Sequence, residues 1–87
     1  MWDCNRVTRL EYRSGYSYFV GFDDGLSAVL DFAEYPNYGG VFAPLRSLEF
    51  FRQAHIEGGS IAWPNGADIA PETLYMKCEQ AALSPAS

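Results

Sequence analysis

The chain has few of the residues that build metal sites, disulfide frameworks or polyanion-binding surfaces. It holds two cysteines and one histidine among 87 residues, and six lysines and arginines against eleven aspartates and glutamates, so its formal charge is −5. Zinc sites need closely spaced ligands, and nucleic-acid binding depends on basic side chains at phosphates. We therefore expect no metal, no cofactor and no direct contact with nucleic acid.

Long apolar runs are also missing, because no stretch approaches the roughly 20 residues that a membrane-spanning helix requires. The start, MWDCNRVTRLEY, does not have the charged region, apolar region and cleavage site of a signal peptide. Cys4 and Cys78 lie near opposite ends and form no CxxC motif. These features predict a cytoplasmic protein with reduced thiols and no membrane association.

Aromatic side chains, by contrast, are abundant. Aromatics make up 16% of the residues and hydrophobic residues 48%. Each aromatic side chain buries roughly 150–250 Å², which offsets the poor surface-to-volume ratio of so short a chain. We expect a single domain over residues 1–83 and a flexible tail over residues 84–87.

Alternating apolar and polar residues predict a three-stranded antiparallel meander between residues 4 and 32. In the first strand the apolar phase breaks between Val7 and Leu10, which indicates a bulge or a late start. The second and third strands, YSYFVGF and LSAVLDF, are joined by Asp-Asp-Gly, a strong signal for a tight hairpin. Both faces of the meander carry apolar residues, so each is expected to be covered at least in part.

The part of the sequence that follows the meander predicts short helices and strands that pack against this sheet. An irregular connector over residues 33–40 precedes a helix over residues 47–54, Gly58-Gly59 joins a second hairpin, and Pro71 opens a final helix. The fold class is α+β: an antiparallel sheet, made of the meander and a short second hairpin, with one or two short helices packed against it. The expected core includes Leu10, Tyr18, Val20, Leu30, Phe42, Leu45, Phe51, Ile61, Trp63 and Leu74.

A catalytic site has little support in this pattern. His55 is the single histidine, and a small thiol enzyme would have to pair it with Cys4 or Cys78. A lone histidine is more often structural, and nothing next to His55 orients it. Asp23 and Asp24 precede a glycine at a hairpin tip, which favours turn formation over paired catalytic carboxylates. We assign no catalytic residues.

Arg6, Arg9 and Arg13 fall within eight residues and are either a small basic patch or the polar side of the first strand. The second interpretation is favoured, because strands half exposed to water alternate in this way. The local arginine cluster therefore does not change the expectation for nucleic acid.

The segment WPNGAD is the one place where the sequence suggests a surface binding site. It puts an indole, an amide and a carboxylate on a single tight loop, at Trp63, Asn65 and Asp68. Aromatic side chains beside polar groups are favoured at interfaces. In the alternative, which turn propensities favour, Trp63 belongs to the core, Pro64-Asn65-Gly66 is only a turn and Asp68 accepts backbone hydrogen bonds.

Four blocks carry a resemblance: RVTRLEY, FDDGLSAVLDF, GGVFAPLRSLEFFRQA and GGSIAWPNGADIAPETLY. In this order the chain resembles a bacterial family of small proteins described only as a domain of unknown function, number 2442. The likeness covers residues 5–76, and the last block is its most specific part. The connector over residues 34–38 departs from it by being longer and more aromatic, which indicates an altered surface there.

The resemblance implies an α+β domain with no established catalytic residues. Some relatives are single domains encoded beside another small protein, and others are joined to a helix-turn-helix domain, which this chain is expected to lack. We expect a non-catalytic protein-interaction or regulatory module that acts with a partner such as a neighbour-encoded protein, and the acidic charge favours a basic one. A homodimer through an exposed sheet edge, a small-ligand sensor and a thiol enzyme remain open alternatives.

Overall fold

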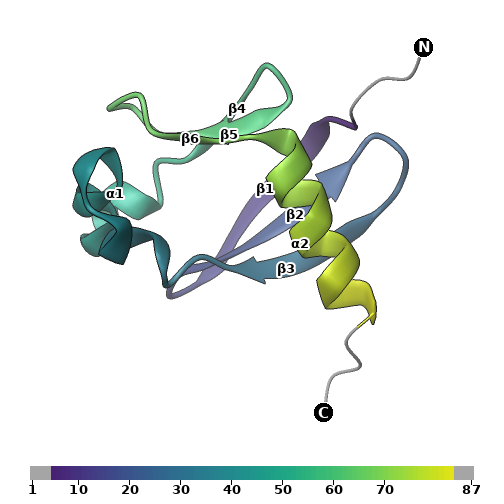
Figure 1. Cartoon of the computed structure of the whole chain (residues 1–87), viewed down its shortest axis with the longest axis horizontal. Helices are drawn as coiled ribbons and strands as arrows, with labels where there is room; N and C mark the ends of the chain where they lie inside the picture. The colour runs from purple at the N-terminus through teal and green to yellow at the C-terminus, as the bar shows by residue number, and fades with distance from the viewer. Residues whose placement is uncertain (1–4, 84–87) are drawn as a thin grey trace.

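Two small antiparallel sheets form the frame of the molecule, and helical segments connect and cover them (Figure 1). The computed structural model describes residues 5–83, so Cys4 and the expected tail over residues 84–87 lie outside the described residues. In Figure 1 the second sheet lies above the first, the helical connector lies to the left of both, and the last helix crosses in front of the first sheet. The α+β fold class expected from the sequence is confirmed.

The first sheet is the expected meander, with strands in the order β1-β2-β3. Its strands are β1 (Val7–Ser14), β2 (Ser17–Phe22) and β3 (Ser27–Asp31). The register of β1 against β2 shifts between Val7 and Arg9, which is the irregularity that the broken apolar phase predicts. The side of β2 that faces the core is buried at Tyr18, Val20 and Phe22.

The connector after β3 is more regular than the sequence suggests. It contains two 3₁₀ helices, η1 (Tyr35–Tyr38) and η2 (Gly40–Arg46). Pro36 restricts the backbone within the first turn of η1, and the positive φ values of Gly39 (74°) and Gly40 (56°) turn the chain between the two segments. The expectation of an irregular connector over residues 33–40 was therefore wrong.

The helix expected over residues 47–54 is shorter, because α1 covers only Leu48–Phe51. The carbonyl oxygen of Phe51 accepts hydrogen bonds from the Tyr18 hydroxyl (2.8 Å) and the Trp63 indole N–H (2.9 Å). These side chains satisfy a carbonyl group that a longer helix would have bonded internally. Tertiary contacts thus take over the hydrogen-bonding role of the next helical turn.

The second sheet contains the expected hairpin and one further strand. Its strands are β4 (His55–Glu57), β5 (Ser60–Ala62) and β6 (Asp68–Ile69), in the order β4-β5-β6. The two residues of β6 are too few to show an alternating pattern in the sequence, so this strand was missed. After it comes α2 (Pro71–Leu83), which starts at the expected proline.

The two sheets meet where β1 approaches the turn between β4 and β5. The N–H of Val7 donates to the carbonyl of Gly59 at 2.9 Å. Gly59 has a φ of +86°, and a Cβ atom there would lie 3.1 Å from side-chain atoms of Arg6. Both its conformation and the space available favour glycine at this junction.

The expected core is confirmed except at Leu10 and Phe42, which are only partly buried and pack against its edge. Phe32 is a further buried aromatic side chain that the expected set did not include. Helix α2 closes one side of the core with Leu74 and Cys78, both fully buried.

Helix α2 is also held at the β2–β3 hairpin. The Tyr75 hydroxyl donates to the Asp24 carboxylate at 2.5 Å, and the Tyr75 ring meets Phe22 edge-on at 5.0 Å between centroids. The hydrogen bond from Tyr75 lowers the pKa of Asp24, and the bond to Asp24 raises the pKa of Tyr75 to about 12. The pair therefore favours a neutral phenol facing an ionised carboxylate.

Replacing Phe51 by alanine should reduce the free energy of unfolding by about 3–5 kcal/mol, because it opens a cavity at the centre of the aromatic core. Denaturant unfolding followed by circular dichroism would measure the loss. Leu48→Ala is the matched control, since Leu48 lies in the same short helix but is 41% exposed, and it should cost less than about 1 kcal/mol. Equal losses for the two variants would contradict the central position of Phe51.

Tyr75→Phe should lower the denaturation midpoint at neutral pH while leaving the ring contact with Phe22 in place. Because the folded pKa of Tyr75 is raised to about 12, its contribution is complete below the unfolded pKa and is lost as pH rises toward 12. The folded pKa of Asp24 is lowered, so its contribution is lost as pH falls through that value. Unfolding curves across pH should show the wild-type advantage narrowing at both extremes, whereas a pH-independent difference would contradict the pairing.

Candidate functional site

The loop that the sequence singled out joins β5 to β6 as a tight turn. The Gly66 N–H donates to the Trp63 carbonyl at 3.0 Å, and the Trp63 N–H donates to the Ala67 carbonyl at 2.8 Å. Gly66 has a φ of 94°, a conformation that glycine adopts without steric penalty. This closed turn fixes the positions of Trp63, Asn65 and Asp68 relative to one another.

Trp63 lies in the core and anchors the loop. Its side chain is only 2% exposed, its indole N–H donates to the Phe51 carbonyl, and its ring lies 6.0 Å from the Phe51 ring centroid. One part of the residue nevertheless lines a surface hollow. Trp63 therefore contributes to this surface as part of a floor and not as a protruding side chain.

Asn65 is exposed and connects the loop to the helical connector. Its side-chain oxygen accepts the Ala67 N–H at 3.1 Å, while its side-chain N–H donates to the Val41 carbonyl at 2.8 Å. The first bond is the Asx-type closure expected of asparagine in a turn. The second is a tertiary contact that brings η2 beside the loop.

An exposed apolar surface lies on the connector that Asn65 contacts. We define the aromatic patch as Tyr38, Val41 and Phe42, of which Tyr38 is 60% and Val41 52% exposed. The rings of Tyr38 and Phe42 lie 6.2 Å apart, and both contact the buried ring of Tyr35, at 5.0 and 5.4 Å. The sequence indicated an aromatic connector but not its contact with the loop, because Asn65 and Val41 lie 24 residues apart in the chain.

Asp68 lies exposed on β6, next to a hollow of about 210 Å³ in the second sheet. The hollow is lined by Glu57, Ser60, Ala62, Trp63, Gly66 and Asp68. The Glu57 carboxylate lies 3.1 Å from Nε2 of His55, and the Ser60 hydroxyl donates to the Glu57 backbone carbonyl at 2.9 Å. Two carboxylate side chains beside an indole would suit a small polar or cationic ligand.

The described cysteine does not have the properties of a catalytic thiol. Cys78 is fully buried in α2, with its sulfur 3.9 Å from the Val20 carbonyl, and burial raises the pKa of its thiol to about 11. His55 is instead exposed on β4, where its ring contacts Glu57. A nucleophilic cysteine needs a lowered pKa and access to solvent. Cys4, the other thiol considered, lies outside the described residues.

The arginines of β1 project outward over one aromatic ring. The guanidinium groups of Arg9 and Arg13 lie 5.2 and 5.0 Å from the Phe19 ring centroid, and both contact the Glu11 carboxylate, at 2.8 and 3.5 Å. These contacts support the interpretation that the alternating pattern favours, in which Arg9 and Arg13 lie on the polar side of β1. They also balance part of the local positive charge.

Within residues 5–83, no group of three or more histidine, cysteine, aspartate or glutamate side chains is placed to hold a metal ion. In the same part of the chain, no helix combines the length and apolar character needed to cross a bilayer.

The fold and this surface define a small α+β domain in which a tight loop supports an exposed aromatic patch. Comparison with family models matches residues 7–80 to "Protein of unknown function (DUF2442)", so the chain belongs to that family. No curated protein and no solved structure matches the chain. The family expected from the sequence is therefore confirmed, and the surface itself must indicate the function.

Cys78 should react with iodoacetamide far more slowly than free cysteine at neutral pH, because burial both shields the thiol and raises its pKa. Mass spectrometry of peptides from the alkylated native protein would follow the reaction, and denatured protein provides the control for full reactivity. Fast native labelling of Cys78 that His55→Ala abolishes would support a thiol enzyme instead.

Proposed function

We propose that this protein is a non-catalytic protein-interaction or regulatory module that binds a partner protein through the aromatic patch and the adjoining Asn65. The observation that carries the proposal is the exposure of Tyr38 and Val41 on a connector fixed by hydrogen bonds and ring contacts. Rigid tyrosine and phenylalanine side chains bury large areas at low entropic cost, and aromatic residues dominate binding energy at interfaces.

The partner is proposed to present an apolar pocket with basic residues at its rim. The chain carries a formal charge of −5, and complementary charge accelerates encounter and fixes the orientation of binding. The proposed partner is a small neighbour-encoded protein, as the resemblance implies, and both proteins are proposed to act in the cytosol. The same net charge, with Arg9 and Arg13 both engaged by Glu11, argues against direct binding to nucleic acid.

A second candidate is a small-ligand sensor that uses the hollow beside Asp68. Its volume of about 210 Å³ is small for an organic ligand, and Trp63, Glu57 and Asp68 supply aromatic and negatively charged contacts. The thermal shift of the wild-type protein in a metabolite screen tests this candidate. A hit that Asp68→Asn abolishes, with no partner recovered, would favour the sensor.

Val41→Glu should weaken partner binding, because it places a carboxylate within the apolar contact that the aromatic patch would make. A tagged copy co-expressed with the neighbour-encoded protein would be purified, and the amount of untagged partner retained would be compared. We expect a loss on the order of tenfold or more, the range of an interface hot spot.

Met76→Glu is the matched control for this experiment, since Met76 is 50% exposed but lies on α2. It introduces the same charge and should retain the partner at the wild-type level. Circular dichroism would verify that both variants are folded. Equal retention by Val41→Glu and the wild type would exclude the aromatic patch as the binding surface.

A further inference from the structure

Strand β3 is an edge strand of the first sheet, since the order is β1-β2-β3 and β3 pairs with β2 (Figure 1). The opposite edge, formed by β1, approaches β4 of the second sheet. Within the described residues, no strand pairs with the free side of β3. An open edge presents unpaired backbone groups to which another strand can bond.

The hydrogen bonds at the two ends of the β2–β3 ladder identify which residues point outward. Phe22 N–H donates to the Leu26 carbonyl and Phe32 N–H donates to the Tyr16 carbonyl, each at 2.8 Å. The register between these pairs is unbroken, and bonded and non-bonded pairs alternate in an antiparallel ladder. The N–H and C=O groups of Ser27, Val29 and Asp31 are therefore directed away from β2.

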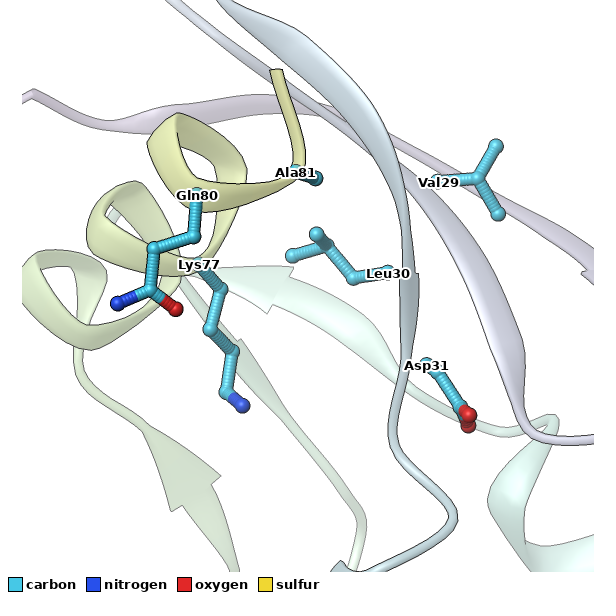
Figure 2. Close-up of a pocket in the computed structure, with 6 residues that line it drawn as sticks. All are labelled: Val29, Leu30, Asp31, Lys77, Gln80 and Ala81. Carbon is cyan, nitrogen blue, oxygen red and sulfur yellow. The ribbon is translucent and has the colours of Figure 1, made fainter. Parts of the chain in front are cut away.

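The side chains along this edge do not block a second strand. Val29 is 53% exposed and lies opposite Phe19 on the outer face, while Leu30 points toward α2 (Figure 2). A groove of about 300 Å³ follows the edge between β3 and α2. It is lined by Val29, Leu30, Asp31, Lys77, Gln80 and Ala81. β3 itself contains no proline, lysine or bulge, which are usual devices that prevent edge pairing, and the charged side chains beside it are Asp31 at its end and Lys77 of α2 in the groove.

We propose that this edge binds the same edge of a second copy of the chain, so that two β3 strands pair antiparallel about a two-fold axis at Val29. In this register Val29 lies opposite Val29 of the second copy, and each Ser27 lies opposite the other copy's Asp31. The three outward residues form three bonded pairs, or about six backbone hydrogen bonds. An isologous contact of this kind closes on itself as a dimer.

The sequence of β3 favours this register over its neighbours. Sliding one strand by two residues places Val29 opposite Ser27 or Asp31 and loses one bonded pair. Sliding it by four residues toward the end of β3 places the two Asp31 carboxylates opposite each other, which is repulsive. Centred on Val29, each Ser27 hydroxyl can instead donate to a carboxylate.

The same register also joins the exposed Val29 and the partly buried Phe19 into a longer apolar row. Phe19 is the cross-strand partner of Val29, so the paired sheets would carry Phe19, Val29, Val29 and Phe19 side by side over four strands. Cross-strand aromatic and β-branched pairs stabilise sheets. Burial of Val29 against its own copy removes from water a side chain that is otherwise more than half exposed.

Sedimentation equilibrium of the full chain over a range of concentrations tests the proposal. The expected result is a reversible dimer that Val29→Lys weakens on the order of tenfold or more, because it sets two like charges opposite each other. Thr8→Lys, which places the same charge on the exposed surface of β1, should leave the dimer unchanged. Circular dichroism would confirm that each variant is folded.

Two substitutions at Ser27 test the register itself. Ser27→Lys would face Asp31 of the second copy and should tighten the dimer at low salt, whereas Ser27→Asp should weaken it. Val41→Glu, which alters the aromatic patch, should have no effect on the dimer, so this test is independent of the proposed function. A monomer at every concentration, or a dimer insensitive to Val29→Lys and both Ser27 variants, would overturn the proposal. If the wild-type chain is a monomer that binds a different protein, and Val29→Lys abolishes that binding, the edge would be assigned to that protein and the dimer proposal would be wrong.

Discussion

The backbone carbonyl of Phe51 is the point on which the rest of the structure depends. It accepts the Tyr18 hydroxyl from the first sheet and the Trp63 indole N–H from the second. The Phe51 ring lies 5.0 Å from the rings of both Tyr16 and Tyr18. Buried donors must find acceptors, so these two bonds fix how the sheets are held against α1. The early end of α1 is the structural consequence.

This arrangement also positions the candidate site. Because Trp63 is held by Phe51, the loop that follows it is fixed at its first residue, and the turn bonds of Asn65 and Gly66 fix the remainder. Asn65 can then bond the Val41 carbonyl and present the aromatic patch beside the loop. The residues of the β3 edge are not those of this surface, so the two proposed binding surfaces can be tested separately.

Local pattern was enough to predict the meander and both hairpins. Alternation in YSYFVGF, the Asp-Asp-Gly turn and the helix-opening Pro71 each depend on neighbours in sequence. Prediction failed where a distant group decided the outcome. Helix α1 ends early because Tyr18 and Trp63 bond its last carbonyl, and β6 exists because Ile69 pairs with Ile61. Leu10 and Phe42 have core-type side chains but only reach the edge of the core.

The sequence alone determined the α+β class, the order of the first five strands along the chain and the closed turn at Asn65, since these follow from periodicity and from the conformational preferences of glycine, proline and asparagine. Only the tertiary structure decided that Trp63 is buried, that Asn65 reaches Val41, and that no other strand of residues 5–83 pairs with one side of β3. The reason is physical: each of these outcomes depends on contacts between residues far apart in the chain, and no local preference encodes which distant partner will satisfy a hydrogen bond or cover a side chain.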